Sequence, residues 1–479
     1  MDIKSYLGKR GYASVDDNYC AKIDEWLEWY QGDVETFHRY TIYNGIQRVP
    51  MRRKTLNMAK AVSEDWANLL LNEKTQISAG DFQKQLDAIL LANRWHTQVV
   101  RWVELSFALG TGALVEYLDT QGAPNIDYIR ADMIFPLSWE NGLITECAFG
   151  SKRVIDKREC VYLQMHLKSP NGYIVENHLF DDKSGEEMPP GDMADIITTG
   201  SPEPMYQIFT PNIVNNVDLD CPMGVAIFSN ALSVLMSLDL VYDSYCNEFD
   251  LGRKRVMLPM SMLQMTTTRE GDDTIQPVFD TSDTTFYALP TGGADDGKPY
   301  EINMSLRAQE HELALQTQLN LLSQKCGMGN DRYQFGHDGV RTATEVISEK
   351  SDLYQNLKKH ERLLTDTLTG MVRSLAYLCN TAPPDVTIMY DDGIINDDNT
   401  KIDNNIKLVT AELKSKLSAI MDIYGMSEKE AQAELDRINE ESRSISGSDV
   451  DIFGQEPKED AESDEDSEDE DEKNEDKDK

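Results

Sequence analysis

A glycine-studded loop that runs directly into one very long helix constrains this chain most. From Cys326 the sequence reads CGMGNDRYQFGHDGVR, and an uninterrupted helical pattern follows from Thr342 to Asn380. Thr342 opens a capping box, no proline occurs before Pro383, and only Gly370 weakens the interior. Thirty-nine residues at about 1.5 Å each predict about 58 Å of helix. Such a helix is longer than an ordinary small domain is wide, so we expect it to cross several layers of structure.

The loop before this helix combines glycines, which permit large backbone changes, with a few cations. Its members of interest are Gly329, Gly336, Gly339, Arg332, His337 and Arg341. Two interpretations remain open. The loop is either a part that moves against another molecule or a mobile surface linker between two helices.

The chain is strongly acidic, and its charge is uneven. The net charge is −38 over 479 residues, and residues 456–479 carry 15 acidic and 4 basic side chains, which is −11. This segment has almost no apolar residue, so we expect a disordered tail. The tail either only aids solubility, or repels DNA or engages a basic partner. The other residues, 1–455, carry a net charge of −27. This charge argues against tight binding of nucleic acid, which needs clustered Lys and Arg. It does not argue against a surface that lets nucleic acid pass.

Cysteine usage and hydropathy indicate a soluble protein. Seven cysteines form no CxxC pair, which is typical of free thiols in a reducing cytosol. The N-terminus has no apolar signal core. The longest charge-free apolar run, Met223–Leu238, is too short to span a bilayer and indicates a buried helix.

The first half of the chain predicts one α+β domain. Apolar periodicity predicts helices over Leu56–Ser78, Asp81–Ala92 and His96–Leu109. Alternation predicts strands over Ala113–Leu118 and Ile126–Ile129, and a hairpin centred on Pro170, Asn171 and Gly172.

The middle of the chain predicts two helices that flank a small β insert. Met223–Gly252 is apolar on more than one side, as is typical of a helix buried between neighbours. The cluster Arg253-Lys254-Arg255 follows, and we favour a helix C-terminal role for it over a phosphate contact. Short β-type runs then occupy Val256–Asn303, and Met304–Leu322 is helical again.

The C-terminal part predicts a strand and a compact helical subdomain. Val386–Tyr390 has a strand pattern, and Ile402–Tyr424 repeats apolar residues as one amphipathic helix stopped by Gly425. Ser427 begins a capping box and a last helix.

Motifs for catalysis, cofactors or metals are missing from the sequence. Gly110-x-Gly112 lacks the third glycine of a dinucleotide site, and Gly297-Lys298 is followed by proline. His311-Glu312 lacks the second histidine of a zinc helix. Asp391–Asp398 indicates a turn rather than a calcium loop, so we expect no catalytic, cofactor-binding or metal residues.

Four segments carry a resemblance to a known family. They are Asp65–Ser78, Ala108–Asp119 continued by Ala131–Trp139, Leu238–Val256, and TATEVISEKSDLYQNLKKHE from Thr342 continued by Tyr390–Glu441. In this order they resemble the portal (head–tail connector) proteins of tailed bacteriophages, of the type found in siphophages of Gram-positive bacteria.

The resemblance implies an α+β portal-type subunit. Its parts would be an α+β wing (residues 1–220), a first stem helix (221–255), a β-containing clip (256–303), a second stem helix (304–327), a tunnel loop (328–341), a long spine helix into the wing (342–381), a wing strand with a helical crown (382–445) and a disordered acidic tail (446–479).

The resemblance also implies a function. About twelve copies would form a homo-oligomeric ring at one capsid vertex. Double-stranded DNA would pass through it during packaging and ejection, and the terminase large subunit, head-completion (adaptor) proteins and the major capsid or scaffolding protein would dock on it. We expect location in the virion, and in the host bacterial cytoplasm during assembly, without a membrane or an enzymatic step. The alternative is a non-channel capsid scaffold or an acidic DNA-mimic protein; a nuclease or hydrolase has less support.

Overall fold

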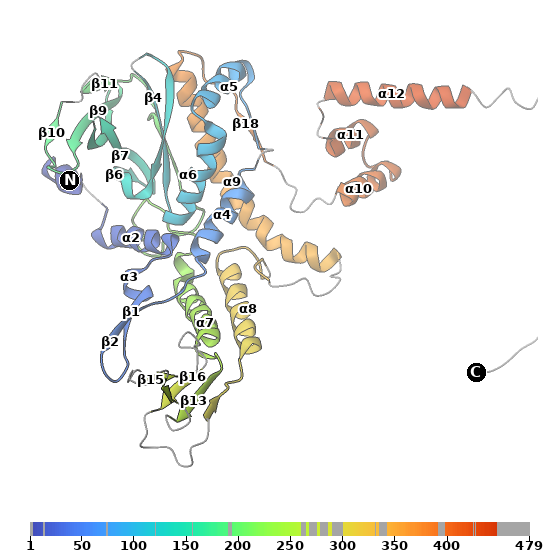
Figure 1. The fold of residues 1–479 in the computed structure, drawn as a ribbon. Coiled ribbons are helices and arrows are strands. Elements are labelled where there is room, and N and C mark those ends of the chain that lie inside the picture. Colours follow the sequence, from blue (N-terminus) through green and yellow to red (C-terminus); the bar gives the residue numbers. More distant parts are fainter. Residues whose placement is uncertain are drawn as a thin grey trace, which may run out of the picture. The chain divides into compact units, whose positions relative to one another are not determined.

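The computed structural model describes residues 3–12, 15–72, 75–119, 121–155, 157–189, 194–259, 265–267, 275–277, 286–289, 300–330, 332–334, 343–390, 398–424, 426 and 428–447. The chain divides into two compact units, Met1–Ile395 and Asn396–Lys479 (Figure 1). Helices and strands occur together, so the predicted α+β class is confirmed. Residues 446–447, where the predicted acidic tail begins, still belong to the last helix, and residues 448–479 lie outside the described residues.

The helices of the first unit include a long helix within each of the predicted ranges Met223–Gly252 and Thr342–Asn380. They are α1 (Ile3–Lys9), α2 (Asp17–Gln31), α3 (Glu35–His38), α4 (Met58–Leu70), α5 (Gln83–Ala92), α6 (Trp95–Leu109), α7 (Leu232–Leu251), α8 (Ala308–Lys325) and α9 (Ala343–Leu378). With 36 residues, α9 is about 54 Å long.

The strands of the first unit form several small sheets and one of six strands. They are β1 (Arg39–Tyr43), β2 (Arg48–Arg52), β3 (Gln76–Ser78), β4 (Gly112–Leu118), β5 (Pro124–Arg130), β6 (Ile134–Glu140), β7 (Leu143–Ile155), β8 (Arg158–Ser169), β9 (Gly172–Asp181), β10 (Glu187–Met188), β11 (Ile196–Thr198), β12 (Tyr206–Phe209), β13 (Arg255–Pro259), β14 (Met265–Thr267), β15 (Ile275–Pro277), β16 (Phe286–Leu289), β17 (Tyr300–Ile302) and β18 (Thr387–Met389).

The six-stranded sheet has the order β10-β9-β8-β7-β6, and β11 pairs with β9. The register of β8 and β9 pairs Ser169 with Gly172, so the hairpin predicted at Pro170–Gly172 is confirmed. A separate three-stranded antiparallel sheet has the order β12-β4-β5.

The core of the first unit lies beside the sheet β12-β4-β5. Helices α6 and α9 pack on this sheet, and α4 packs on both helices. Trp66 of α4 and Phe107 of α6 are buried there, with ring centroids 5.8 Å apart. Gly370 leaves room for the side chain of Gln207 from β12, because a Cβ at this position would lie 2.2 Å from Gln207 Oε1.

The prediction of one helix over Leu56–Ser78 is wrong at its C-terminal end. Helix α4 ends at Leu70, and Leu71 is already extended, with φ −126° and ψ 102°. Residues 76–78 instead form β3, in which Ile77 pairs with Ile388 of β18. Pairing with a distant strand therefore overrides the local helical pattern.

The prediction of one helix over Met223–Gly252 is wrong at its start. Residues 223–228 are buried but not helical, and α7 follows the short 3₁₀ turn η3 (Ser229–Ala231). The reason is a backbone-to-backbone contact: a Cβ on Gly224 would lie 2.3 Å from the carbonyl oxygen of Gly110, whose own φ is +83°. The Gly224 N–H donates to Thr111 Oγ1 at 3.0 Å.

Helices α7 and α8 lie side by side and carry a small β module at their far end (Figure 1). In this module β13 pairs with β16 in parallel and with β17 antiparallel, and β14 pairs with β15. The chain order helix, β insert, helix is the one that the sequence predicts.

The second unit is helical. It contains α10 (Asp398–Thr410), α11 (Lys416–Tyr424) and α12 (Glu428–Gly447). The prediction of a single helix over Ile402–Tyr424 is wrong. The helix is interrupted at Glu412, whose backbone is left-handed with φ +57°. Leu413 N–H donates to the carbonyl of Leu408 at 2.9 Å, a hydrogen bond that closes the end of α10. Gly425 and Ser427 lie outside the described residues.

Candidate functional site

The loop that follows α8 begins from a fixed turn. Gly327 is left-handed with φ +77°, and its N–H donates to the carbonyl of Gln324 at 3.1 Å. The Met328 N–H donates to the carbonyl of Ser323 at 2.9 Å, which makes a Schellman-type helix end. The Met328 side chain is 3% exposed and belongs to the core.

Side chains from two other helices hold the carbonyls of this turn. Trp66 of α4 donates from Nε1 to the carbonyl of Cys326 at 3.0 Å. Asn356 of α9 donates from Nδ2 to the carbonyl of Gly327 at 3.0 Å. The Trp66 ring also meets the ring of His360 edge-on at 4.8 Å, and burial lowers the pKa of His360 to about 4, so this imidazole is neutral at pH 7.

The next residues of the loop also contact the folded body. Arg332 lies 3.5 Å from the carboxylate of Asp65 in α4, and its side chain is 38% exposed. The carbonyl of Tyr333 accepts a hydrogen bond from Gln316 Nε2 at 3.2 Å. Burial raises the pKa of the Tyr333 hydroxyl above its ordinary value.

The predicted loop residues therefore divide into two groups. Gly329, with φ +83°, and Arg332 belong to the part that the structure describes. Gly336, His337, Gly339 and Arg341 lie outside the described residues. Sequence reasoning placed the start of the loop correctly but missed its anchors Trp66 and Asn356, because no spacing in the sequence indicates that these helices meet.

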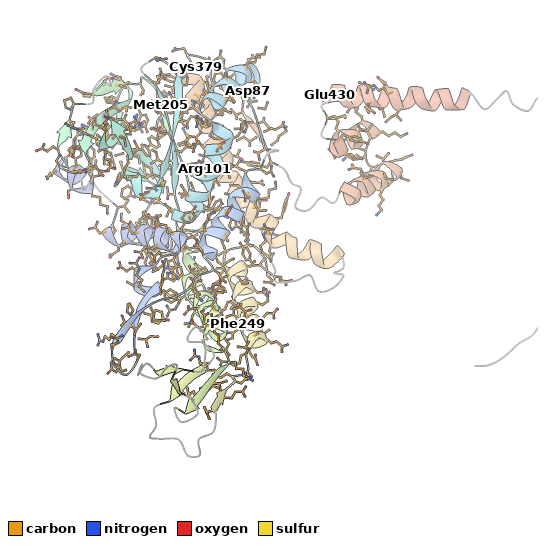
Figure 2. The ribbon with its side chains drawn as sticks, in the orientation of Figure 1. Asp87, Arg101, Met205, Phe249, Cys379 and Glu430 are labelled. Atoms are coloured by element: carbon orange, nitrogen blue, oxygen red, sulfur yellow. The ribbon has the colours of Figure 1, made fainter. Side chains whose placement is uncertain are left out.

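An ion-pair cluster joins α7 to the segment before α8 at the end of the pair that carries the β module. Glu248 accepts hydrogen bonds from Arg307 at 3.1 Å and 2.8 Å, and the Arg307 guanidinium lowers the pKa of this carboxyl to about 2. The His311 Nε2 lies 3.8 Å from the same carboxylate. Phe249 lies close by, near the end of α7 (Figure 2), and its side chain is 43% exposed.

The basic cluster after α7 is engaged within the chain. Lys254 pairs with Glu301 of β17 at 2.5 Å, and Arg253 lies 3.7 Å from Asp250. The Lys254 pair connects the segment after α7 to the β module, whereas the Arg253 pair is local, because Asp250 belongs to α7 itself. The preferred helix C-terminal role of this cluster stays a prediction, and the ion pairs are an additional role for Arg253 and Lys254.

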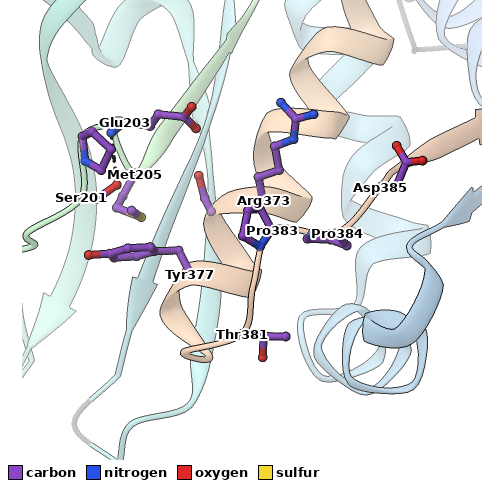
Figure 3. Close-up of a pocket in the computed structure, with 11 residues that line it drawn as sticks. Ser201, Glu203, Met205, Arg373, Tyr377, Thr381, Pro383, Pro384 and Asp385 are labelled. Carbon is purple, nitrogen blue, oxygen red and sulfur yellow. Dashed lines mark hydrogen bonds between the residues drawn. The ribbon is translucent and has the colours of Figure 1, made fainter.

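A cavity of about 490 Å³ lies between the segment before β12 and the end of α9 (Figure 3). Its charged lining residues are Glu203, Arg373 and Asp385, and neither histidine nor cysteine lines it. It therefore lacks a nucleophile paired with a histidine base, and we assign it no chemistry.

The described residues contain neither a metal-binding cluster nor a membrane-spanning helix. Among the described residues, no group of three or more His, Cys, Asp or Glu side chains could hold a metal ion. No helix in the described ranges has the length and apolarity needed to cross a bilayer.

Comparison with known families decides the identity. The family described as "Phage portal protein, SPP1 Gp6-like" matches residues 174–448, which is more than half of the chain. The chain belongs to this portal family. Within the portal protein, the match begins in β9 and includes α7, the β module, α8, the loop, α9 and the helices of the second unit.

Other comparisons add little to the portal assignment. No curated protein matches. Among solved structures, a chain of the "Virion of native gene transfer agent (GTA) particle" is 9% identical, with a TM-score of 0.39 over 77% of this chain and 88% of that chain. A chain of the "Neck of native GTA particle computed with C12 symmetry" is 10% identical, with a TM-score of 0.37 over 76% and 88%.

Proposed function

We propose that this portal protein forms a closed ring at one vertex of a phage capsid and acts as the conduit for double-stranded DNA. The observation that carries the proposal is the helix–β–helix projection of α7, the β module and α8, which lies inside the family match. On this proposal the terminase large subunit and the head-completion proteins dock on the projection. The subunit itself performs no catalytic step.

The parts of the subunit take the following proposed roles. Helices α7 and α8 are the stem, the β module is the clip, and α9 is the spine that runs into the α+β wing. The three helices of the second unit form the crown. The loop from Met328 to Arg341 is the tunnel loop, with a base held by Trp66 and Asn356.

Exposed apolar side chains on the stem support assembly with other copies. On α7, Met236 and Leu240 are 37% and 49% exposed; Leu313 on α8 is 71% exposed. Apolar groups on a projecting helix pair are stabilised when a neighbouring subunit covers them.

The acidic balance supports a conduit rather than a tight binder. Residues 1–455 carry a net charge of −27 per chain, and a channel wall of this sign would repel phosphate groups, so a passing duplex would find few sites of strong attachment. Weak cationic contacts at the loop would then guide DNA without stalling it.

Negative-stain microscopy combined with light scattering tests this function. We expect closed rings with a central hole and a mass near 650 kDa, from about twelve copies of the 54.2 kDa chain. A scaffold or DNA-mimic protein requires no such hole, so solid or monomeric particles under all salt conditions would reject the conduit.

A further inference from the structure

A basic hairpin projects beside the stem. Strands β1 and β2 pair from Arg39–Arg52 to Tyr43–Arg48, so both strands are fully matched. The turn is ordered: Asn44 Oδ1 accepts from the N–H groups of Ile46 at 3.0 Å and Gln47 at 2.8 Å. Gly45 has φ +90°, as a tight turn of this kind requires.

The hairpin differs in charge from the rest of the chain. Residues 39–54 carry five basic and no acidic side chains, whereas the whole chain has 46 basic and 84 acidic ones. Arg39 and Arg52 each contact Asp33 at the base, at 2.7 Å and 3.5 Å. Arg48, near the tip, is exposed and has no ion-pair partner among the described residues.

The tip of the hairpin also exposes apolar side chains to solvent. Ile46 is 88% exposed, Tyr43 is 65% exposed and Ile42 is 46% exposed. The Tyr43 hydroxyl donates to the carbonyl of Gly45 at 3.0 Å, which fixes the ring over the turn. An ordered turn that exposes apolar groups loses little conformational entropy when a partner covers it.

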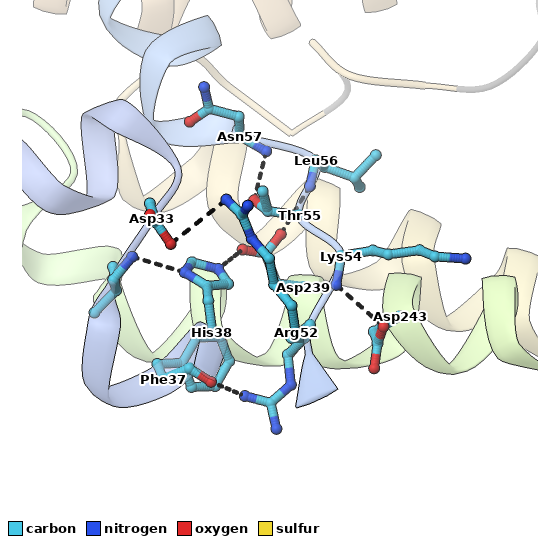
Figure 4. Close-up of polar contacts among 12 residues, drawn as sticks. Asp33, Phe37, His38, Arg52, Lys54, Thr55, Leu56, Asn57, Asp239 and Asp243 are labelled. Atoms are coloured by element: carbon cyan, nitrogen blue, oxygen red, sulfur yellow. Dashed lines mark hydrogen bonds and ion pairs between the residues drawn. The ribbon is translucent and has the colours of Figure 1, made fainter. Parts of the chain in front are cut away.

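Buried polar contacts fix the base of the hairpin to α7 (Figure 4). The Val34 N–H donates to Nδ1 of His38 at 2.8 Å, so Nε2 carries the proton and donates to Asp239 at 3.1 Å. Asp239 also accepts from the N–H of Leu56 at 2.9 Å, and Asp243 accepts from the N–H of Lys54 at 3.1 Å.

The hairpin and α8 contact different sides of α7. At about 100° per residue, Asp239, Asp243 and Asp250 lie within about 40° of one another around the helix. Tyr245 and Glu248, which contact His311 and Arg307 on the α8 side, lie at least about 120° away from all three. A subunit therefore presents a basic hairpin on one flank of the stem and α8 on the other.

The free face of α8 complements the hairpin. Leu313 is 71% exposed. Glu310 and Glu312 lie close before it in the sequence and are exposed, and Glu312 has no ion-pair partner among the described residues. Apolar groups flanked by carboxylates match apolar groups flanked by an arginine.

We propose that the β1–β2 hairpin clasps the outer face of α8 in the next copy of this chain. The contact is heterologous, because two different surfaces of the subunit meet, and repetition of such a contact around an axis closes a ring. This proposal rests on the ring of the proposed function and adds the element that links its subunits. DNA is the less suitable occupant, because phosphates would leave Ile46 and Tyr43 uncovered.

Photo-cross-linking tests the contact directly. Benzoylphenylalanine replaces Ile46 in the full chain, and purified rings are irradiated and digested for mass spectrometry. We expect covalent dimers joined to peptides of α8, because the tip would lie against Leu313. Cross-links only to DNA, only within one chain, or to another part of the neighbour would overturn the proposal.

Charge exchange gives a second, independent measurement. Arg48→Glu and Glu312→Arg should each raise the protein concentration at half-assembly about tenfold, equivalent to about 1.4 kcal/mol. The double variant should restore assembly toward the wild-type value. The matched control is Arg158→Glu, an exposed arginine of β8, which should leave assembly unchanged.

Different results would reject the proposed ring and the proposed contact between the β1–β2 hairpin and α8. If wild-type protein forms no rings, the proposed function is rejected. If wild-type rings form and Arg48→Glu rings form equally well, only the clasp is rejected. If both single variants weaken assembly and their combination does not recover it, the pairing of these two surfaces is wrong.

Discussion

Glu116 of β4 is an uncompensated carboxyl in the core. Its side chain is 1% exposed, and neither carboxylate oxygen has a hydrogen-bond partner. Burial raises the pKa of this carboxyl well above its ordinary value, because the charged form would lose its hydration. The folded state therefore keeps a proton that the unfolded state releases.

Glu116→Gln should remove a pH dependence of stability. In wild-type protein the free energy of unfolding falls by about 1.4 kcal/mol per pH unit as the pH rises from the unfolded pKa, near 4.3, toward the raised folded pKa. The variant lacks this loss and should be more stable at pH 7. Unfolding followed by circular dichroism between pH 5 and 8 measures the difference, and the exposed Glu159→Gln is the control. Equal slopes in wild type and Glu116→Gln would show that Glu116 ionises freely.

Arg332 and Arg341 belong to the segment that we propose as the tunnel loop. We expect the double change Arg332→Glu and Arg341→Glu to leave rings intact and to lower the DNA packaged per head by about twofold or more, because it replaces weak phosphate contacts by repulsion. Arg332 forms a partly exposed ion pair with Asp65 at 3.5 Å. Exposed ion pairs contribute only about 0–1 kcal/mol to stability, so the loss of this one should not unfold the subunit.

The control for the loop separates DNA contact from folding. Asp65→Asn frees Arg332 from its partner without removing the cation, so packaging should not fall. Ring yield is measured beside DNA per head in each variant. Normal packaging in the double arginine variant would show that the loop only connects α8 to α9 and has no role in packaging.

At the scale of elements, the β module is too small for a core of its own, since its sheets have three and two strands among the described residues. We therefore expect its strands to pair with those of the neighbouring subunit. Deleting Thr266–Asp283 should leave rings partly intact but abolish terminase docking and DNA packaging. The control removes residues 462–479, a stretch of equal length. Normal packaging after the first deletion would show that the module is not the clip.

The sequence predicted those elements whose signals are local. Periodicity and capping predicted α6 and α9, and alternation about Pro170–Gly172 predicted the hairpin β8–β9. Residues 223–228 were misread because apolar composition does not reveal the Gly110–Gly224 contact. The hairpin β1–β2 was missed, although Asn44-Gly45 is a strong turn signal between alternating residues.

The candidate site was less predictable than the fold. The sequence identified the loop by its glycines and cations, which are properties of single positions. The contacts that anchor it, from Trp66, Asp65 and Asn356, join residues far apart in the chain. Such pairs depend on the packing of α4, α8 and α9, which no spacing in one sequence records.

At the scale of the whole molecule, the acidic tail should be dispensable for assembly. Residues 456–479 have a net charge of −11 and almost no apolar group, so they offer nothing to bury in an interface. Truncation after Gly454 should leave the number of subunits per ring and the assembly concentration unchanged, so the ring mass should fall only by the mass of the residues removed. Light scattering of both forms at low and high salt is the measurement. Loss of rings on truncation would give the tail a structural role.

Trp66 has a mechanical consequence. Its indole is held by the carbonyl of Cys326 at the end of α8, and its ring packs against Phe107 of α6 and His360 of α9. Because these contacts join the end of α8 to α4, α6 and α9, we expect a displacement of α8 to be transmitted to all three helices rather than absorbed by the adjoining glycines. In the proposed ring, the proposed stem and wing would then move together under pressure from the channel, instead of sliding past each other.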